Sequence, residues 1–316
     1  MPPPKNEKAA ALSRDLLQGL DSLFGVHPGY RPVHAKGVML VGEFQPFPAA
    51  ASLSRAPHFQ APTPVTVRVS DFAGIPAIPD NDPEGASPRG FAIRFHLGEH
   101  LHTDIVSHSY DGFPTRTANE FVEFLRAAAS SDPSKPHPNP IEVFLTANPK
   151  ALAFVQGPKP FPTSFARESY FSVSAFKFTG PAGASRYGRY QIHPDAGNEY
   201  LDSEAAAARS ANYLFDELKE RVSKGPVKFH FALQLAEDGD VVDDATVRWP
   251  EERSKLPLGE IVLNAEVSND DAEKHRIIFD PIPRVDGIDA SADPLLEARA
   301  DVYLLSGRRR RYATQP

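Results

Sequence analysis

The sequence predicts an α+β protein built on an antiparallel β-barrel with helical additions. Six or more strand-like segments, rich in Val, Ile, Phe and Tyr, follow one another with turn residues between them. Such strands commonly pair with their neighbours in the chain, and helical patterns lie before, between and after them. The 32 prolines argue for many turns and against a helical bundle. The strand-like segments are residues 37–44, 63–72, 90–97, 103–108, 170–179, 186–193 and 227–236.

Three helices are predicted before the last part of the chain. Residues 12–24 place leucines on one stripe, as an amphipathic helix requires. Thr117, with the glutamate three residues later, forms a capping box that opens a helix at about 118–129. An alanine-rich helix is expected at 203–224, closed by Gly225.

The last part of the chain combines a connector with a final helix. Residues 247–264 contain two prolines that forbid a continuous helix, and we interpret them as an irregular connector. Residues 291–307 are predicted to be helical. Ser291 would cap this helix, Pro294 would lie in its first turn, and Gly307 would end it.

Composition excludes several classes of function. The net charge of −7 argues against general affinity for nucleic acid or anionic membranes. The absence of cysteine excludes disulfides, thiolate catalysis and iron–sulfur clusters. The chain has no apolar run of about 18–20 residues, which a membrane span needs, and no signal-peptide pattern. We therefore expect a soluble, cytoplasmic protein without membrane or nucleic-acid partners.

A histidine cluster and an arginine cluster resemble functional sites, but their sequence contexts argue against those functions. His96, His100 and His102 resemble part of a zinc site, but they lie at a strand–turn–strand junction without an obvious fourth ligand, so a solvated turn is expected. The four arginines at 308–311 resemble a nucleic-acid patch. They directly follow the last predicted helix in an acidic protein, which argues against that role.

Arg299 and Tyr303 are the first candidate site residues. They are four residues apart on the last predicted helix and so share one face. An arginine one turn away stabilises phenolate over phenol, and phenolate is a hard anionic ligand that suits ferric iron, including haem iron. The more common role for such a tyrosine is to cap the core. Spacing alone leaves both roles open.

The segment RPVHAKG, residues 31–37, changes this balance, because the chain resembles the haem catalases. That family carries R-x-x-H-A-K-G before its first barrel strand and R-x-x-x-Y near the end of its core, and both motifs are present here. The resemblance covers about residues 28–312 and is greatest to the short catalase-related peroxidases. Five further segments match in the same order: VTVRVS (65–70), PRGFAIRF (88–95), VRWP (247–250), LGEIVLN (258–264) and IIFDP (277–281).

The resemblance implies a fold and a cofactor. The fold would be the catalase core, an eight-stranded antiparallel barrel with helical additions and a C-terminal helix that carries the proximal ligand. Residues 1–27 would form an N-terminal helical arm, and residues 28–316 a single domain that binds haem b. A homodimer is left open.

The resemblance also implies a role for each matching residue. Tyr303 would be the proximal iron ligand, with Arg299 holding it as phenolate. His34 would be the distal general acid–base, and Ser70 would fix its tautomer by bonding the other ring nitrogen. The remaining matches are Arg31, Arg68 and Arg310 for the haem propionates, and Val33, Phe113, Phe121 and Phe279 for the apolar walls.

Two positions depart from the family pattern. The family has an asparagine four residues after the aspartate that matches Asp104, and this chain has His108 there. We expect His108 to take the place of the asparagine in handling peroxide. It is bulkier and, with a reference pKa of about 6.5, could be cationic near working pH. A proximal-side histidine is replaced by Ser174. Both departures argue against efficient peroxide dismutation.

The predicted function is a haem-dependent peroxidase with weak catalase activity. It would reduce hydrogen peroxide or organic hydroperoxides with a small organic electron donor. Two alternatives remain open: a fatty-acid hydroperoxide isomerase or dehydratase on the same core, and a non-catalytic haem or ligand carrier whose wide barrel encloses its ligand. The distal group of Arg31, His34 and Ser70 argues against a carrier, which needs no acid–base.

Overall fold

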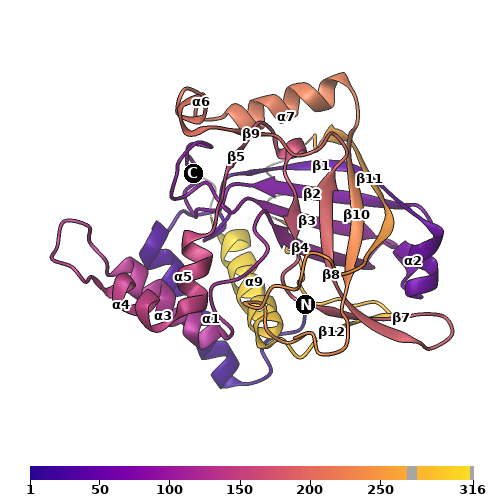
Figure 1. Cartoon of the computed structure of the whole chain (residues 1–316), viewed down its shortest axis with the longest axis horizontal. Helices are drawn as coiled ribbons and strands as arrows, with labels where there is room; N and C mark the ends of the chain where they lie inside the picture. The colour runs from indigo at the N-terminus through magenta and orange to yellow at the C-terminus, as the bar shows by residue number, and fades with distance from the viewer. Residues whose placement is uncertain (269–275, 314–316) are drawn as a thin grey trace.

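A closed antiparallel barrel forms the centre of the computed structural model, which describes residues 1–268 and 276–313 (Figure 1). In this part of the chain eight strands pair in the circular order β10–β11–β1–β2–β3–β4–β6–β8, with β8 pairing back to β10. The predicted eight-stranded barrel is confirmed. Its strands are β1 (Gly37–Pro46), β2 (Thr63–Ser70), β3 (Gly90–His96), β4 (His102–His108), β6 (Tyr170–Phe171), β8 (Ser185–Pro194), β10 (Val227–Leu235) and β11 (Lys255–Glu266).

Within residues 1–268 and 276–313, four short strands lie outside the ring. The strands β7 (Phe176–Thr179) and β12 (Ile288–Ala290) extend the sheet from β8. A separate pair joins β5 (Phe161–Pro162) to β9 (Tyr200–Leu201).

The barrel interior is a packed hydrophobic core. Alternate residues of each strand point inward, as in the register row Leu40–Val67–Ile93–Ile105 across β1 to β4. Aromatic rings fill the centre: Phe44 meets Phe95 and Phe231 edge-on, with ring centroids 5.4 and 5.5 Å away. A barrel filled by its own side chains does not enclose a ligand. The carrier alternative, which placed the ligand inside the barrel, is therefore wrong in that respect.

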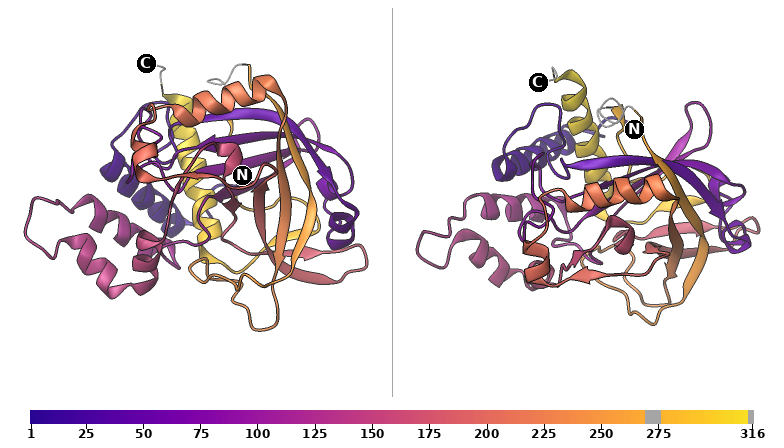
Figure 2. Two further views of the ribbon diagram at one scale, coloured as in Figure 1. Left: turned by 45° about the horizontal axis from the view of Figure 1, so that its top comes forward. Right: turned by 90° about the horizontal axis from the view of Figure 1, so that it is seen from above.

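The helices gather mainly on one side of the barrel. Figures 1 and 2 show α9 (Pro294–Tyr312) standing between the barrel wall and the helices α1 (Glu7–Phe24) and α3 (Ala118–Ala129). Helix α1 packs against both α3 and α9. The other helices in the described residues are α2 (Pro48–Leu53), α4 (Pro140–Ala147), α5 (Pro149–Gln156), α6 (Ser203–Ala207) and α7 (Tyr213–Lys224), with 3₁₀ turns η1 (Pro57–Phe59) and η2 (Phe165–Arg167).

Two predictions about strands are wrong. The segment 170–179 forms two short strands, β6 and β7, rather than one. The expected connector at 247–264 contains most of β11, a full barrel strand. Its Pro257 lies where the register of the β10–β11 pair shifts. A bulge tolerates a residue that has no N–H to donate, so the proline does not break the strand.

The helix predictions also need correction. The capping box at Thr117 is confirmed, but 203–224 is two helices, α6 and α7. Between them the carbonyl of Ala211 accepts hydrogen bonds from Lys36 and from the backbone of Asp80. Asp293, rather than Ser291, caps α9 and accepts from the backbone of Leu295 at 2.9 Å.

Three other features of the helices were predicted differently or missed. Helix α9 continues past Gly307 to Tyr312. Helix α1 begins earlier than expected, at Glu7, and α4 and α5 were not predicted. Among the described residues, no helix combines the length and apolar character needed to cross a membrane.

Candidate active site

A cavity lies between the outer face of the barrel and α9. The cavity and the open space at its mouth together measure about 740 Å³. One wall is the row Arg68–Ala92–Val106, which pairs in register across β2, β3 and β4 and faces away from the barrel core. The opposite wall comes from α9, and the segment containing Ile278 and Phe279 closes one side.

His34 holds an unusual backbone conformation at one end of this cavity. Its φ of 57° is the only positive value for a non-glycine residue in the described chain. This left-handed region is sparsely populated by residues with a Cβ, and it marks functional sites when the surroundings enforce it. The backbone N–H of His34 donates to the carbonyl of Phe72 at 2.6 Å.

A row of residues across three strands makes room for the imidazole ring. Ser70, Gly90 and His108 pair directly on β2, β3 and β4, so they share one face of the sheet. A Cβ at Gly90 would lie 2.9 Å from Nδ1 of His34 and 2.5 Å from Oγ of Ser70. The glycine therefore leaves the space that the histidine ring occupies.

The carbonyl of Asp71 determines the tautomer of His34. Nδ1 of the ring lies 2.9 Å from this carbonyl oxygen and 3.2 Å from Oγ of Ser70. A carbonyl only accepts, whereas a hydroxyl can donate or accept, so Nδ1 carries the proton and Nε2 is left unprotonated. We expected Ser70 to fix the tautomer. The structure assigns most of that task to Asp71, a backbone contact that no sequence motif marks.

The imidazole of His34 stays neutral. Burial, together with the charges of Arg68 and then Arg31, lowers its pKa from 6.5 to about 3, against a smaller opposing effect of the Asp71 carbonyl. An unprotonated Nε2 in a residue that lines the cavity can accept a proton at ordinary pH.

Tyr303 lies on the cavity wall formed by α9. Nε of Arg299, one turn earlier, donates to the tyrosine oxygen at 3.3 Å, as the sequence spacing predicted. Ser174 does not contact either residue in the described hydrogen bonds. Its hydroxyl instead donates to the Asp293 carboxyl at 2.7 Å, at the start of the same helix. Burial raises the pKa of Asp293.

The three predicted propionate arginines all line the cavity. Arg31 and Arg310 converge, because each donates to the carbonyl of Ile277 at 3.2 Å. Burial, and then the charge of Arg311, lower the pKa of Arg310 to about 10. Arg68 donates to the carbonyls of His34 and Ala35 at 2.9 and 3.2 Å. It therefore also supports the turn that carries the histidine.

The predicted apolar walls divide into two groups. Val33 and Phe279 line the cavity. Phe113 and Phe121 contact each other with their ring planes tilted by 48° and their centroids 5.1 Å apart. They are not among the described residues that line the cavity, but they pack, with Tyr303, against the cluster between α1, α3 and α9.

His108 lies in the same register row as Ser70 and Gly90, and it is not among the described residues that line the cavity. Its charge differs from the sequence prediction. Its Nδ1 accepts from the backbone N–H of Tyr110 at 3.3 Å, so the neutral ring carries its proton on Nε2. Burial, followed by the charges of His34 and Arg299, lowers its pKa to about 3. The expectation that His108 could be cationic near working pH is therefore wrong.

The histidine cluster and the arginine cluster form no common site in the described residues; their side chains have different partners. His96 bonds Thr66, His100 is exposed, and in the described residues no group of three or more histidine, aspartate or glutamate side chains is arranged to hold a metal ion. The four arginines belong to α9: Arg309 forms a bidentate pair with Asp21, and Arg311 donates to the carbonyl of Arg276.

Comparison with known proteins identifies the family. A sequence model of the catalase family matches residues 28–314. A catalase-related peroxidase of Synechococcus elongatus is 33% identical over 301 residues, which cover 93% of this chain and 87% of the relative. Another, of Mycolicibacterium paratuberculosis, is 30% identical over 286 residues and covers 89% of each. A crystal structure of a fungal catalase, 25% identical, superposes with a TM-score of 0.76 over 89% of this chain and 59% of that one. The chain therefore belongs to the catalase family.

Proposed function

We propose that this protein is a haem-dependent peroxidase that reduces hydrogen peroxide or organic hydroperoxides with a small organic electron donor. As a member of the catalase family it is an oxidoreductase that acts on peroxide. The observation that carries the finer proposal is the state of His34. Its ring is neutral, its Nδ1–H is held by the Asp71 carbonyl, and it lines the same cavity as Tyr303.

The cavity suits haem, the cofactor of this family. Tyr303 offers an oxygen ligand that Arg299 favours as an anion. Val33, Ile278 and Phe279 offer apolar walls for a flat macrocycle. Arg31, Arg68 and Arg310 offer guanidinium groups for carboxylates. We propose haem b; the absence of cysteine excludes the covalent thioether links of haem c.

Bound haem would supply the redox chemistry that breaks the peroxide bond. The chain supplies the proton transfers. Nε2 of His34 accepts a proton from one oxygen of the peroxide and returns it to the other, which leaves as water or as an alcohol. The Asp71 carbonyl keeps Nδ1 protonated throughout, so the same nitrogen serves as base and then as acid.

Weak dismutation follows from the chemistry of His108. Releasing oxygen requires a second hydrogen peroxide to be held while it loses two hydrogens. An asparagine amide would present a donor and an acceptor. His108 presents one donor, because its Nδ1 is already engaged by the backbone of Tyr110. The bulk of the imidazole adds to this effect.

The test compares two reactions of the same haem-loaded protein. The unmodified protein should oxidise an added dye with hydrogen peroxide while releasing little oxygen at an oxygen electrode. His108→Asn should raise oxygen release relative to dye oxidation. Vigorous oxygen release by the unmodified protein, or a ratio unchanged in the variant, would overturn the assignment of His108. Absence of dye oxidation would overturn the proposed peroxidase activity.

A further inference from the structure

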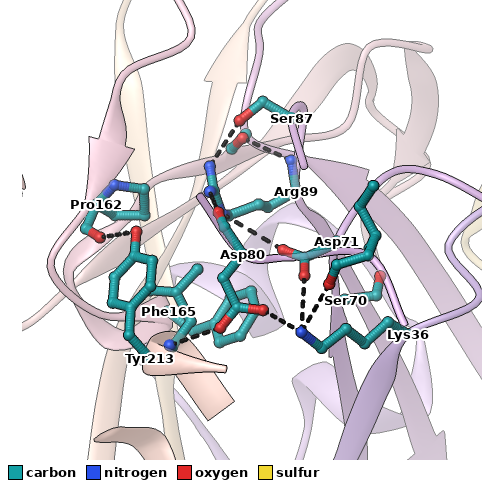
Figure 3. Close-up of polar contacts among 12 residues, drawn as sticks. Lys36, Ser70, Asp71, Asp80, Ser87, Arg89, Pro162, Phe165 and Tyr213 are labelled. Carbon is teal, nitrogen blue, oxygen red and sulfur yellow. Dashed lines mark hydrogen bonds and ion pairs between the residues drawn. The ribbon is translucent and has the colours of Figure 1, made fainter. Parts of the chain in front are cut away.

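A buried cluster of charged residues lies on the segments that hold His34 in place. It consists of Lys36, Asp71, Asp80 and Arg89, and Figure 3 shows Lys36 between the two carboxyl groups, with Arg89 on the far side of Asp71. The side chains of Asp71, Asp80 and Arg89 are fully buried, and that of Lys36 is 12% exposed. Buried charges are expensive unless they are paired, so the cluster needs an explanation.

We propose that Lys36 is a positioning residue for the peroxide reaction, and that its ammonium group locks the turn carrying His34 onto the segment that supplies the Asp71 carbonyl. The inference rests on the proposed function because it takes His34 as the acid–base. Lys36 itself does not touch the cavity. It would act through the geometry of the residue two positions before it.

The ammonium group is fully committed to a structural task. It donates to the carbonyl of Ile78 at 2.8 Å, to Oδ1 of Asp80 at 2.5 Å and to the carbonyl of Ala211 at 2.9 Å. An ammonium has three protons, so all three are used. It also lies 4.9 Å from the centre of the Phe215 ring. These partners come from the segment after β2 and from the residues at the start of α7.

Asp80 makes this clamp rigid at its other end. Its second carboxylate oxygen accepts from the backbone of Leu214 at 2.7 Å, and its backbone N–H donates to Ala211 at 2.9 Å. Its carbonyl accepts from the Arg89 guanidinium at 2.7 Å. Arg89 directly precedes Gly90, which lies beneath the His34 ring. The clamp therefore connects Lys36, just before β1, and Arg89, just before β3, to the start of α7.

The backbone around Lys36 completes the connection to the ring. The carbonyl of Lys36 accepts from the N–H of Asp71 at 3.2 Å, and Ala35 donates to Ala73 at 3.0 Å. Residues 34–36 thus run alongside residues 71–73. The carbonyl of Asp71, held in this arrangement, meets Nδ1 of His34. The left-handed turn at His34, which costs about 1–3 kcal/mol in general, persists because both sides of it are held.

The contacts of Asp71 indicate that the cluster holds the backbone segments in position rather than adding stability. Its carboxyl is buried, yet among the described residues neither of its oxygens has a hydrogen-bond partner. Lys36 and Arg89 approach only to 4.0 and 3.7 Å. Burial raises the pKa of Asp71 above its ordinary value, although Arg89 opposes the shift. The two cations make their shorter contacts elsewhere.

The test uses Lys36→Met, which keeps most of the side-chain length and removes the ammonium. In the full chain without added haem, isotope-labelled histidine reports the ring tautomer by nuclear magnetic resonance, and the His34 signal is identified by its absence in His34→Asn. We expect the single Nδ1–H form of the unmodified protein to give way to a mixture. In the haem-loaded protein the peroxide step should slow by about 10- to 100-fold, as misplacement of a catalytic group does.

Two further variants keep the test decisive. Arg253→Met removes a cation that, like Lys36, makes three short polar contacts, but its partners are the carboxylates of Asp240 and Glu237 in a separate loop; it should change neither the tautomer nor the rate. Asp80→Asn weakens the clamp with little change in size, and it decides the matter if Lys36→Met does not fold. We expect a smaller effect in the same direction.

The proposal is overturned if either clamp variant, once folded, keeps the tautomer and rate of the unmodified protein. It is equally overturned if Arg253→Met changes the tautomer as much as Lys36→Met does. The tautomer is measured without haem. A protein that fails to turn over peroxide but shows the tautomer change would contradict the proposed function and leave the clamp standing.

Discussion

His34 combines an unfavourable backbone with a ring that has one unprotonated nitrogen. Its left-handed φ of 57° brings the ring over Gly90, where the Nδ1–H group donates a hydrogen bond to the Asp71 carbonyl. Burial then keeps the ring neutral, with a pKa of about 3. The consequence is a base that remains available across the pH range in which the free residue would titrate.

Replacing His34 should slow the peroxide step without removing haem. Asparagine is the suitable replacement because it tolerates the left-handed region but does not act as a base. General acid–base catalysis contributes about 10²–10⁴-fold, so His34→Asn should slow the step by that factor in stopped-flow absorbance measurements. An unchanged rate would remove His34 from the mechanism.

Ser70→Ala serves as the matched variant for the same measurement. The Asp71 carbonyl stays in place when the hydroxyl is removed, so the rate should fall by less than about tenfold, the effect of one ordinary hydrogen bond. A loss as large as that of His34→Asn would mean that the hydroxyl, and not the carbonyl, fixes the ring.

At this scale the sequence predicted which residues share one cavity better than it predicted the surroundings of each side chain. His34, Ser70 and Tyr303 all line the cavity, as expected from their motifs. The role of Asp71 was not predictable, because it acts through its carbonyl, which every residue has. The charge of His108 was wrong because a reference pKa ignores burial, which here dominates.

Helix α9 forms the wall of the cavity opposite the barrel. Tyr303, Ser306 and Arg310 line the cavity from successive turns, and Arg299 lies one turn before the tyrosine. Gly307 adjoins this face. A Cβ at Gly307 would lie 2.2 Å from Cδ1 and 2.4 Å from Cγ1 of Ile278. The glycine therefore lets the segment with Ile278 and Phe279 approach the helix.

Gly307→Ala tests this contact through the sign of its effect. Helix propensity alone would stabilise the protein by about 1 kcal/mol. We expect the opposite, a lower free energy of unfolding and weaker haem binding, because the methyl group collides with Ile278. Urea unfolding and haem titration measure both.

Ile278→Ala provides the control for this prediction. It removes the atoms that the new methyl group would meet, so adding Gly307→Ala to it should restore the gain from helix propensity. A single Gly307→Ala variant that is more stable than the unmodified protein would contradict the close approach.

Element boundaries were predictable where local chemistry decides them. The capping box at Thr117 places the start of α3 correctly. Tertiary contacts override the local pattern elsewhere. Gly307 looks like a helix end but serves packing, and the alanine-rich pattern is interrupted between α6 and α7, where the carbonyl of Ala211 accepts from Lys36 and Asp80. Strand β11 was missed because its proline occupies a bulge.

The whole molecule separates a packed barrel from a site built on its outer face. The order of the strands predicts the barrel. It does not predict on which side of the barrel the cavity lies. The barrel core also contains a histidine among its hydrophobic residues. His58 is fully buried between aromatic rings, and in the described residues both of its ring nitrogens lack a hydrogen-bond partner.

His58 should make the fold sensitive to acid. Burial lowers its pKa from 6.5 to about 3, so between these values the unfolded chain binds the proton more readily than the folded chain. Stability is then complete above about pH 6.5 and falls as the pH drops toward 3. At pH 5 the loss from this one residue is about 2 kcal/mol.

His58→Phe should reduce the difference in unfolding free energy between pH 7.5 and pH 5 by about that amount. Comparing the two pH values in urea separates the titration from any change in packing. His100→Gln, at an exposed histidine, should leave the difference unchanged. If His58→Phe leaves it unchanged too, the residue is not held neutral in the folded state.

The absorption spectrum of the haem-loaded protein tests the central claim most directly. The account predicts the spectrum of ferric haem bound by tyrosinate, its loss together with most of the haem in Tyr303→Phe, and no change in Tyr312→Phe, where an exposed tyrosine at the end of the same helix is altered. A Tyr303→Phe protein that keeps the spectrum and haem content of the unmodified protein would contradict it.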